Sequence, residues 1–90
     1  MTNQSPAVVL YTTRFCPFCV RAKALLEHKR VSFEEIPVDN DPDKRREMMA
    51  LAGRHTVPQI WIGETHVGGC DELFMLERAG KLDTLLAGTA

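Results

Sequence analysis

Two cysteines separated by two residues are the part of this sequence best suited to chemistry. The motif Cys16-Pro17-Phe18-Cys19 follows a short apolar run, Ala7 to Tyr11, and opens a segment with helical spacing. The pattern therefore predicts two thiols on a strand-to-helix turn. The first N–H groups of a helix have no partner within the helix and the helix dipole is positive there, so a thiolate is favoured at Cys16. Such surroundings lower the pKa of a cysteine from about 8.5 to roughly 3.5 to 7.5.

The positions of the two thiols predict different roles. Cys16, at the helix start, is expected to be a nucleophile at neutral pH. Cys19 lies one turn into the helix, close enough to form a disulfide with Cys16 but with less access to solvent and to the dipole. We therefore expect Cys16 to attack a substrate sulfur and Cys19 to resolve the resulting mixed disulfide.

Length and composition indicate one globular domain. We expect it to span residues 1–90, with about residues 1–6 as a flexible N-terminus. Hydrophobic residues make up 44% and charged residues 26% of the chain, and no uninterrupted apolar run exceeds five residues, so a membrane span is not expected. Residues 1–6 lack the basic and apolar segments of an export signal, which leads us to expect a cytoplasmic location.

Charge and cysteine content narrow the function classes. Eleven basic and twelve acidic side chains give a net charge of −1, and Lys44-Arg45-Arg46 is the one basic cluster, so nucleic acid is not an expected partner. Three cysteines are too few for a structural disulfide framework. A close cysteine pair in a reducing compartment is instead redox-active or metal-binding.

The apolar pattern predicts two strand–helix units, followed by a hairpin and a last helix. Asp41-Pro42 is typical of a helix start and Gly53 of a helix end. Two strand–helix units in succession imply a right-handed crossover between parallel strands. The expected elements are a strand at 7–11, a helix from 16 to about 30, a strand at 31–38, a helix at 42–52, strands at 59–62 and 65–67 around a turn at 63–64, a helix from about 70 to 80, and a short turn at 82–87.

The same pattern predicts which helix faces pack on the sheet. In the second helix Met48 and Met49 are expected in the core. In the first helix the side chains expected to face the sheet are Val20, Ala24, Leu25 and Leu26.

The element order β-α-β-α-β-β-α, with the cysteine pair after the first strand, is that of the thioredoxin fold. Within it, three stretches resemble the signatures of a dithiol (class I) glutaredoxin, in particular the small bacterial glutaredoxin three subgroup. They are Tyr11-Thr12 before the cysteine motif, Thr56-Val57-Pro58-Gln59-Ile60, and Gly68-Gly69-Cys70-Asp71-Glu72-Leu73. The resemblance covers nearly the whole chain and implies an α/β fold with a four-stranded mixed sheet flanked by helices.

The resemblance also implies a glutathione site. In glutaredoxins the stretch matching Thr56-Val57-Pro58 carries a cis-proline that faces the dithiol, and the backbone before it pairs with the cysteinyl backbone of glutathione. The stretch matching Gly69-Cys70-Asp71 binds the γ-glutamyl end: N–H groups at the helix start hold its carboxylate, and Asp71 meets its ammonium. Helix N-termini attract carboxylates, and Asp71 can cap the helix as well. Phe18 takes a position that is usually tyrosine and is expected to flank the cleft.

The glycine carboxylate of glutathione lacks its usual partner in this sequence. Glutaredoxins generally have a lysine three residues before the first cysteine, where this chain has Thr13. Arg14 and Arg45 are therefore the cations expected to bind this carboxylate, although a solvated helix face is an equal alternative for Arg45. Cys70 is either a buried small side chain or a third thiol open to glutathionylation.

The activity that the resemblance implies is glutathione-dependent thiol–disulfide exchange. Cys16 would attack the glutathione sulfur of a protein–glutathione mixed disulfide, and Cys19 would be needed only for protein disulfides. The expected partners are glutathione as co-substrate, glutathionylated or disulfide-containing proteins and, indirectly, glutathione reductase with NADPH. No metal is expected, and the chain is expected to be a monomer.

Three alternatives remain open at this point. The first is a thioredoxin-like protein recharged by a reductase, against which the Gly69-Cys70-Asp71 stretch argues. The second is an iron–sulfur scaffold bridged between two chains by Cys16 and glutathione, although glutaredoxins that assemble clusters generally lack a proline at the position of Pro17. The third is a zinc half-site of Cys16 and Cys19, which no second cysteine pair or spaced histidine pair completes.

Overall fold

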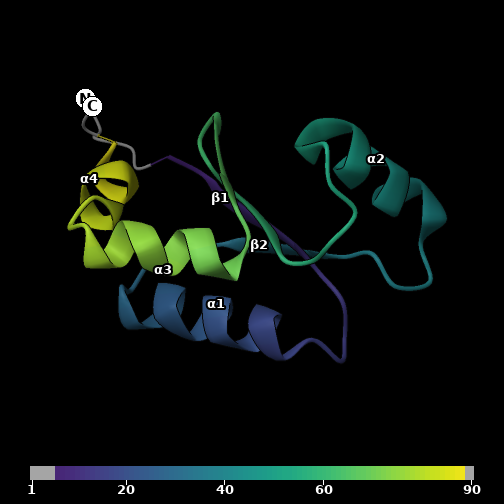
Figure 1. Cartoon of the computed structure of the whole chain (residues 1–90), viewed down its shortest axis with the longest axis horizontal. Coiled ribbons are helices and arrows are strands. Elements are labelled where there is room, and N and C mark those ends of the chain that lie inside the picture. The colour runs from purple at the N-terminus through teal and green to yellow at the C-terminus, as the bar shows by residue number, and fades with distance from the viewer. Residues whose placement is uncertain (1–5, 89–90) are drawn as a thin grey trace.

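A mixed four-stranded sheet with the strand order β2-β1-β3-β4 forms the centre of the structure (Figure 1). The structure is a computed structural model that describes residues 6–88, so the predicted flexible N-terminus lies, except for Pro6, outside the described residues. Strand β1 (Val8–Thr12) pairs in parallel with β2 (Glu34–Pro37) and antiparallel with β3 (Gln59–Ile62). Strand β4 (Thr65–Gly68) closes the hairpin with β3. The predicted sheet is confirmed.

Helices cover both faces of this sheet. Helices α1 (Pro17–His28) and α3 (Cys70–Arg78) lie side by side, with α4 (Leu82–Ala87) beyond the end of α3, and all three pack on the larger part of the core (Figure 1). Helix α2 (Pro42–Ala52) stands apart from them and contributes Met48 to a smaller cluster with Tyr11 and Val38. No described helix is long and apolar enough to cross a membrane.

The predicted helix boundaries follow from local capping. Asp41 accepts a hydrogen bond from the Lys44 N–H at 3.1 Å, and Pro42 takes the first position of α2. That helix ends at Gly53, whose φ of +71° is the left-handed conformation in which a glycine avoids the strain of a side chain. Capping side chains and proline are therefore reliable signals for α2.

Strand β2 is shorter than the predicted 31–38. The chain leaves α1 through Arg30, which has a φ of +60°, and the Val31 N–H still bonds to the Leu26 carbonyl oxygen at 3.3 Å. The first residues after the helix are therefore part of the helix end and cannot pair with β1. Pairing begins at Glu34, opposite Val9.

The segment predicted as a turn at 82–87 is helix α4. Leu82 and Leu86 are both buried, and a spacing of four residues puts them on one helix face. Lys29, near the end of α1, lies 2.6 Å from Glu77 and 2.9 Å from Asp83 and so links α4 to the two larger helices.

The predicted core face of α1 is right for two of its four residues. Leu26 is buried and Leu25 is half-buried against the core, whereas Val20 is 58% exposed and Ala24 is also exposed. The buried stripe of this helix consists of Cys19, Ala22 and Leu26. In α2 the same kind of error affects one methionine, since Met48 is fully buried but Met49 is 38% exposed.

Candidate active site

Three loops meet at one edge of the sheet. Because β1 and β3 are antiparallel, the end of β1 lies beside the start of β3, with Tyr11 opposite Gln59. Because β3 and β4 are also antiparallel, the end of β4 reaches the same edge, with Gly68 opposite Ile60. The segments after β1, before β3 and after β4 therefore come together, and they contain the three sequence signatures.

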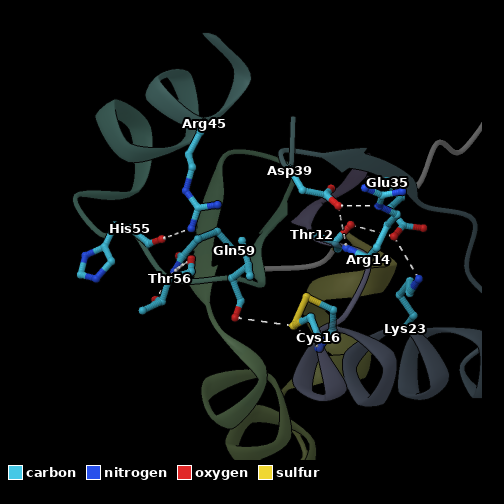
Figure 2. The surroundings of a disulfide bond; sticks show 12 residues. Thr12, Arg14, Cys16, Lys23, Glu35, Asp39, Arg45, His55, Thr56 and Gln59 are labelled. Atoms are coloured by element: carbon cyan, nitrogen blue, oxygen red, sulfur yellow. Dashed lines mark hydrogen bonds and ion pairs between the residues drawn. A yellow bond between two sulfur atoms is a disulfide. The ribbon is translucent and has the colours of Figure 1, made fainter. Parts of the chain in front are cut away.

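The cysteine pair lies on the predicted strand-to-helix turn. Cys16 is the N-cap of α1, and it is joined to Cys19 by a disulfide with the two Cα atoms 5.1 Å apart (Figure 2). The Cys19 N–H donates to the Cys16 sulfur at 3.0 Å, as expected for a sulfur held at a helix N-terminus. Cys16 is 8% exposed and Cys19 only 1%, so Cys16 is the more accessible thiol. This difference supports the predicted roles.

The loop between α2 and β3 faces the disulfide. Its Val57–Pro58 peptide bond is cis, as the resemblance implies. The Val57 carbonyl oxygen lies 3.9 Å from Cys16 Sγ (Figure 2). Thr56 is exposed and Val57 half-buried, so the backbone on the outer side of this loop is open to a ligand.

The start of α3 forms the opposite side. Gly69 is the N-cap, and its N–H donates to Glu72 Oε1 at 2.8 Å. The N–H groups of the first helical residues, from Cys70 on, have no acceptor within the helix. Gly68 has a φ of +111°, and a Cβ there would lie 2.5 Å from Arg54 Nη2, so a side chain would be strained and would push Arg54 away. This arrangement is suited to an anion.

These segments border an open cavity of about 280 Å³. Neither Cys16 nor Cys19 lines it, but Val57, whose carbonyl oxygen faces Cys16 Sγ, does. Phe18 of α1, residues 56–58 and residues 69–72 line it together with Arg54. Seven of the predicted site residues are thus brought to one place, while Arg54 and Glu72 were not predicted to belong to it.

Arg54 is the cation of this cavity. Its side chain is 43% exposed, and Nη1 lies 3.5 Å from Glu72 Oε2. The hydrogen bond from the Gly69 N–H and the charge of Arg54 lower the pKa of Glu72, although burial opposes them. Sequence reasoning missed Arg54, and the available signal was a basic residue in the short loop between Gly53 and Thr56.

Arg14, a predicted glutathione ligand, does not line the cavity. Its Nε donates to Asp39 Oδ2 at 2.9 Å and its backbone N–H to the same oxygen at 3.2 Å (Figure 2). These bonds lower the pKa of Asp39. Arg14 lines a separate hollow with Lys23 and Glu35, on the β2 side of the sheet.

Arg45 also lies outside the cavity. From α2 its Nη2 donates to the His55 carbonyl oxygen at 3.2 Å, which ties the helix to the loop before the cis-proline (Figure 2). The contact between Arg45 and a glutathione carboxylate stays a prediction.

Cys70 lines the cavity with little exposed surface. It is 6% exposed, and this burial raises the pKa of its thiol. The charge of Asp71 also raises this pKa, whereas the charge of Arg21 lowers it. A buried thiol of raised pKa is poorly nucleophilic. Of the two predicted alternatives, this favours the small buried side chain.

Comparison with known proteins identifies the family. The family model described as "Glutaredoxin" matches residues 8–67. A "Glutaredoxin" of Pseudomonas aeruginosa is 63% identical over 82 residues, which cover 91% of this chain and 98% of that protein. "Glutaredoxin 3" of Escherichia coli K12 is 54% identical over 79 residues, 88% of this chain and 95% of that protein. Among solved structures, a buckwheat glutaredoxin–glutathione complex has a TM-score of 0.82 and 31% identity over 98% of this chain and 84% of that chain. With its dithiol at the start of α1, the chain therefore belongs to the glutaredoxin family of thiol–disulfide oxidoreductases.

Proposed function

We propose that this chain reduces protein–glutathione mixed disulfides, with glutathione as the electron donor. The observation that carries the proposal is the cavity beside Cys16 between the cis-proline loop and the start of α3. The buckwheat relative was solved with glutathione, and we carry that ligand over to this cavity.

The cavity offers complementary groups for each end of glutathione. The first N–H groups of α3 would hold the γ-glutamyl carboxylate, and Asp71 would meet the γ-glutamyl ammonium. The Val57 backbone would pair with the cysteinyl unit, like a short strand added to an edge. Arg54 adds positive charge for a carboxylate, and Phe18, which is 51% exposed, supplies an apolar wall.

The proposed reaction is two successive sulfur exchanges. The Cys16 thiolate attacks the glutathione sulfur of the mixed disulfide, the bond to the protein sulfur breaks, and the protein thiolate leaves and takes up a proton. A second glutathione, as thiolate, then attacks the glutathione sulfur on Cys16. Glutathione disulfide forms and the Cys16 thiolate is restored. A low thiol pKa serves Cys16 in both steps, because it is ionised as attacker and departs readily as leaving group.

For protein disulfides the proposal assigns a role to Cys19. Cys16 forms a mixed disulfide with the substrate, and Cys19 attacks Cys16 to release the reduced protein. The product is the Cys16–Cys19 disulfide seen in the structure, which two glutathiones would reduce. A reducing, glutathione-containing compartment such as the cytoplasm, with glutathione reductase and NADPH, would sustain the cycle.

A coupled assay with the parent and two cysteine variants tests this function. With a glutathionylated peptide, glutathione, glutathione reductase and NADPH, we expect the parent to be active and Cys16→Ser to be inactive. Cys19→Ser should retain this activity and lose most reduction of a protein disulfide. Equal loss in both variants on the glutathionylated peptide would refute the role assignment. Turnover with thioredoxin reductase but not with glutathione would refute the glutathione dependence.

A further inference from the structure

A buried amide lies directly behind the loop proposed to receive glutathione. Gln59, the first residue of β3, is fully buried, and its side chain reaches back past Pro58 to Thr56 (Figure 2). Gln59 Nε2 donates to the Thr56 carbonyl oxygen at 3.0 Å and is 3.2 Å from the Thr56 hydroxyl oxygen. The buried amide thus holds the exposed loop residue from the inside.

The other end of this amide is held by the neighbouring strand. Because Gln59 Nε2 faces two oxygen atoms, Oε1 is the atom that faces His66 Nε2, at 2.8 Å, and His66 Nε2–H donates to it. The His66 ring stacks on Trp61, with ring centroids 4.6 Å apart, and is thereby fixed in place. Burial and the charge of Arg54 lower the pKa of His66, and the charge of Glu72 acts in the opposite direction. The lowered pKa favours the neutral ring.

The hydrogen bond from Gln59 determines how the Thr56–Val57 peptide is oriented. In a trans peptide the C=O of one residue and the N–H of the next point in opposite directions. Within residues 6–88 the cis peptide bond is the one between Val57 and Pro58. The Thr56–Val57 peptide is therefore trans. Its carbonyl points to the buried Gln59 amide, so the Val57 N–H points away from that amide, and Val57 itself lines the cavity.

We propose that Gln59 and His66 are positioning residues for glutathione: Gln59 fixes the Thr56–Val57 peptide with its N–H presented to the ligand, and His66 fixes Gln59. The proposal rests on the glutathione function proposed above. Gln59 acts through Thr56 and His66 acts through Gln59, so both should influence glutathione binding more than the reactivity of Cys16.

Two variants remove the bonds and keep the shape. Gln59→Met retains an unbranched side chain without either bonding end, and His66→Phe retains a ring on Trp61 without the N–H. With a glutathionylated peptide we expect Gln59→Met to raise KM about five- to tenfold and His66→Phe about two- to fivefold, with kcat within about twofold of the parent. The double variant should be no worse than Gln59→Met, because both residues act along one path.

Tyr11→Phe is the matched control. Tyr11, like His66, contacts Trp61, and its hydroxyl donates one partly buried hydrogen bond to Glu47 at 2.9 Å. The variant removes that bond but leaves the bonds of Gln59 to the loop intact. We expect KM for the glutathionylated peptide to be unchanged. Alkylation of the reduced protein by iodoacetamide, which needs no glutathione, should proceed at Cys16 within about twofold of the parent rate in every variant, since the thiolate is not altered.

Amide relaxation of Val57 gives a reading that is independent of glutathione use. We expect an order parameter of about 0.85 in the parent and below about 0.6 in Gln59→Met. If the parent did not use glutathione, the proposed function would fail, while the Val57 amide would still decide whether Gln59 fixes the peptide. The proposal is overturned if folded Gln59→Met keeps the parent KM or the parent order parameter, or if Tyr11→Phe raises KM equally. Should Gln59→Met fail to fold, an unchanged KM in His66→Phe would overturn it.

Discussion

At the scale of single residues, the structure adds to the cavity a cation that was not predicted. Arg14 and Arg45 were expected to bind a carboxylate of glutathione, but Arg14 is engaged by Asp39 and Arg45 by the His55 carbonyl. Arg54 is the arginine that lines the cavity. Its Nη2 lies so close to Gly68 that a side chain at that position would have to push the guanidinium away.

Arg54→Met should therefore weaken glutathione use more than Arg14→Met. A partly exposed charge-assisted contact is worth on the order of 1 kcal/mol, so we expect about a fivefold rise in KM for the glutathionylated peptide at low salt. The effect should shrink in about 1 M salt, where the Debye length is only about 3 Å. KM measured at both salt concentrations checks this.

Arg46→Met is the control for that prediction. Arg46 is an exposed arginine that pairs with Asp43 on α2 and does not line the cavity. Its loss should leave KM unchanged. An equal rise in KM for Arg46→Met and Arg54→Met, or a salt-independent effect of Arg54→Met, would contradict a direct role of the Arg54 charge.

Residues within contiguous motifs could be predicted from sequence, and residues that reach the site from elsewhere could not. Phe18, Val57 and Asp71 lie in signature stretches, and the resemblance to glutaredoxins implies that these stretches meet. Arg54 reaches the cavity only because the chain turns at Gly53, with a φ of +71°, and because Gly68 leaves room for the guanidinium. Such an approach depends on the path of two loops, which the basic residue between Gly53 and Thr56 does not reveal by itself.

At the scale of elements, starts and ends of helices were better predicted than their faces. Asp41, Pro42 and Gly53 each satisfy or terminate backbone hydrogen bonds locally, so α2 has the predicted bounds. The face of α1 depends on how the helix packs against the sheet and α3, which is a tertiary constraint. Helix α4 was missed because six residues give less than two turns of periodic pattern.

The hydrogen bond between Tyr11 in β1 and Glu47 on α2 leads us to predict a loss of folding stability at alkaline pH. Burial and the hydrogen bond to Glu47 on α2 raise the pKa of Tyr11 in β1 to about 12, and the charges of Glu47 and Glu34 act in the same direction. The ordinary value is about 10. Between these values the unfolded chain loses the proton that the folded chain keeps. The contribution of Tyr11 to the free energy of unfolding is therefore complete below about pH 10 and is lost as the pH rises towards 12.

The comparison of parent and Tyr11→Phe isolates this contribution from other groups that titrate at high pH. We expect the parent to be more stable than the variant by about 1 kcal/mol near neutral pH, because the hydrogen bond to Glu47 is present. Denaturant unfolding between pH 8 and 12, a range that brackets both pKa values, should show this advantage shrinking above about pH 10. A difference that stayed constant up to pH 12 would mean that Tyr11 is not held in its neutral form.

At the scale of the whole molecule, the antiparallel pairing of β1, β3 and β4 explains why one sheet edge carries the chemistry. It brings a helix start with a dithiol, a cis-proline loop and a second helix start within reach of one small ligand. The fold class could be predicted because the element order and the cysteine motif together match one fold. The precise fit of the loops could not, because it depends on bonds such as that between His66 and Gln59, which joins two neighbouring strands.

The same architecture leads to a prediction about metal and oligomeric state. No group of three or more His, Cys, Asp or Glu side chains within residues 6–88 is arranged to hold a metal ion. The alternative raised by the resemblance is an iron–sulfur cluster bridged between two chains by Cys16 and glutathione. Pro17 occupies the first position of α1 and stiffens the turn that carries Cys16. We therefore expect anaerobically purified protein to be colourless and monomeric.

Absorption spectroscopy with size-exclusion chromatography, in the presence of glutathione, measures both properties at once. Cys70→Ser is a suitable control, because it removes a thiol that lines the same cavity without touching the dithiol. A visible absorption band that accompanied dimerisation, persisted in Cys70→Ser and vanished in Cys16→Ser would overturn the expectation. It would show that Cys16 ligates a shared cluster, and exchange chemistry would then compete with cluster binding for one thiolate.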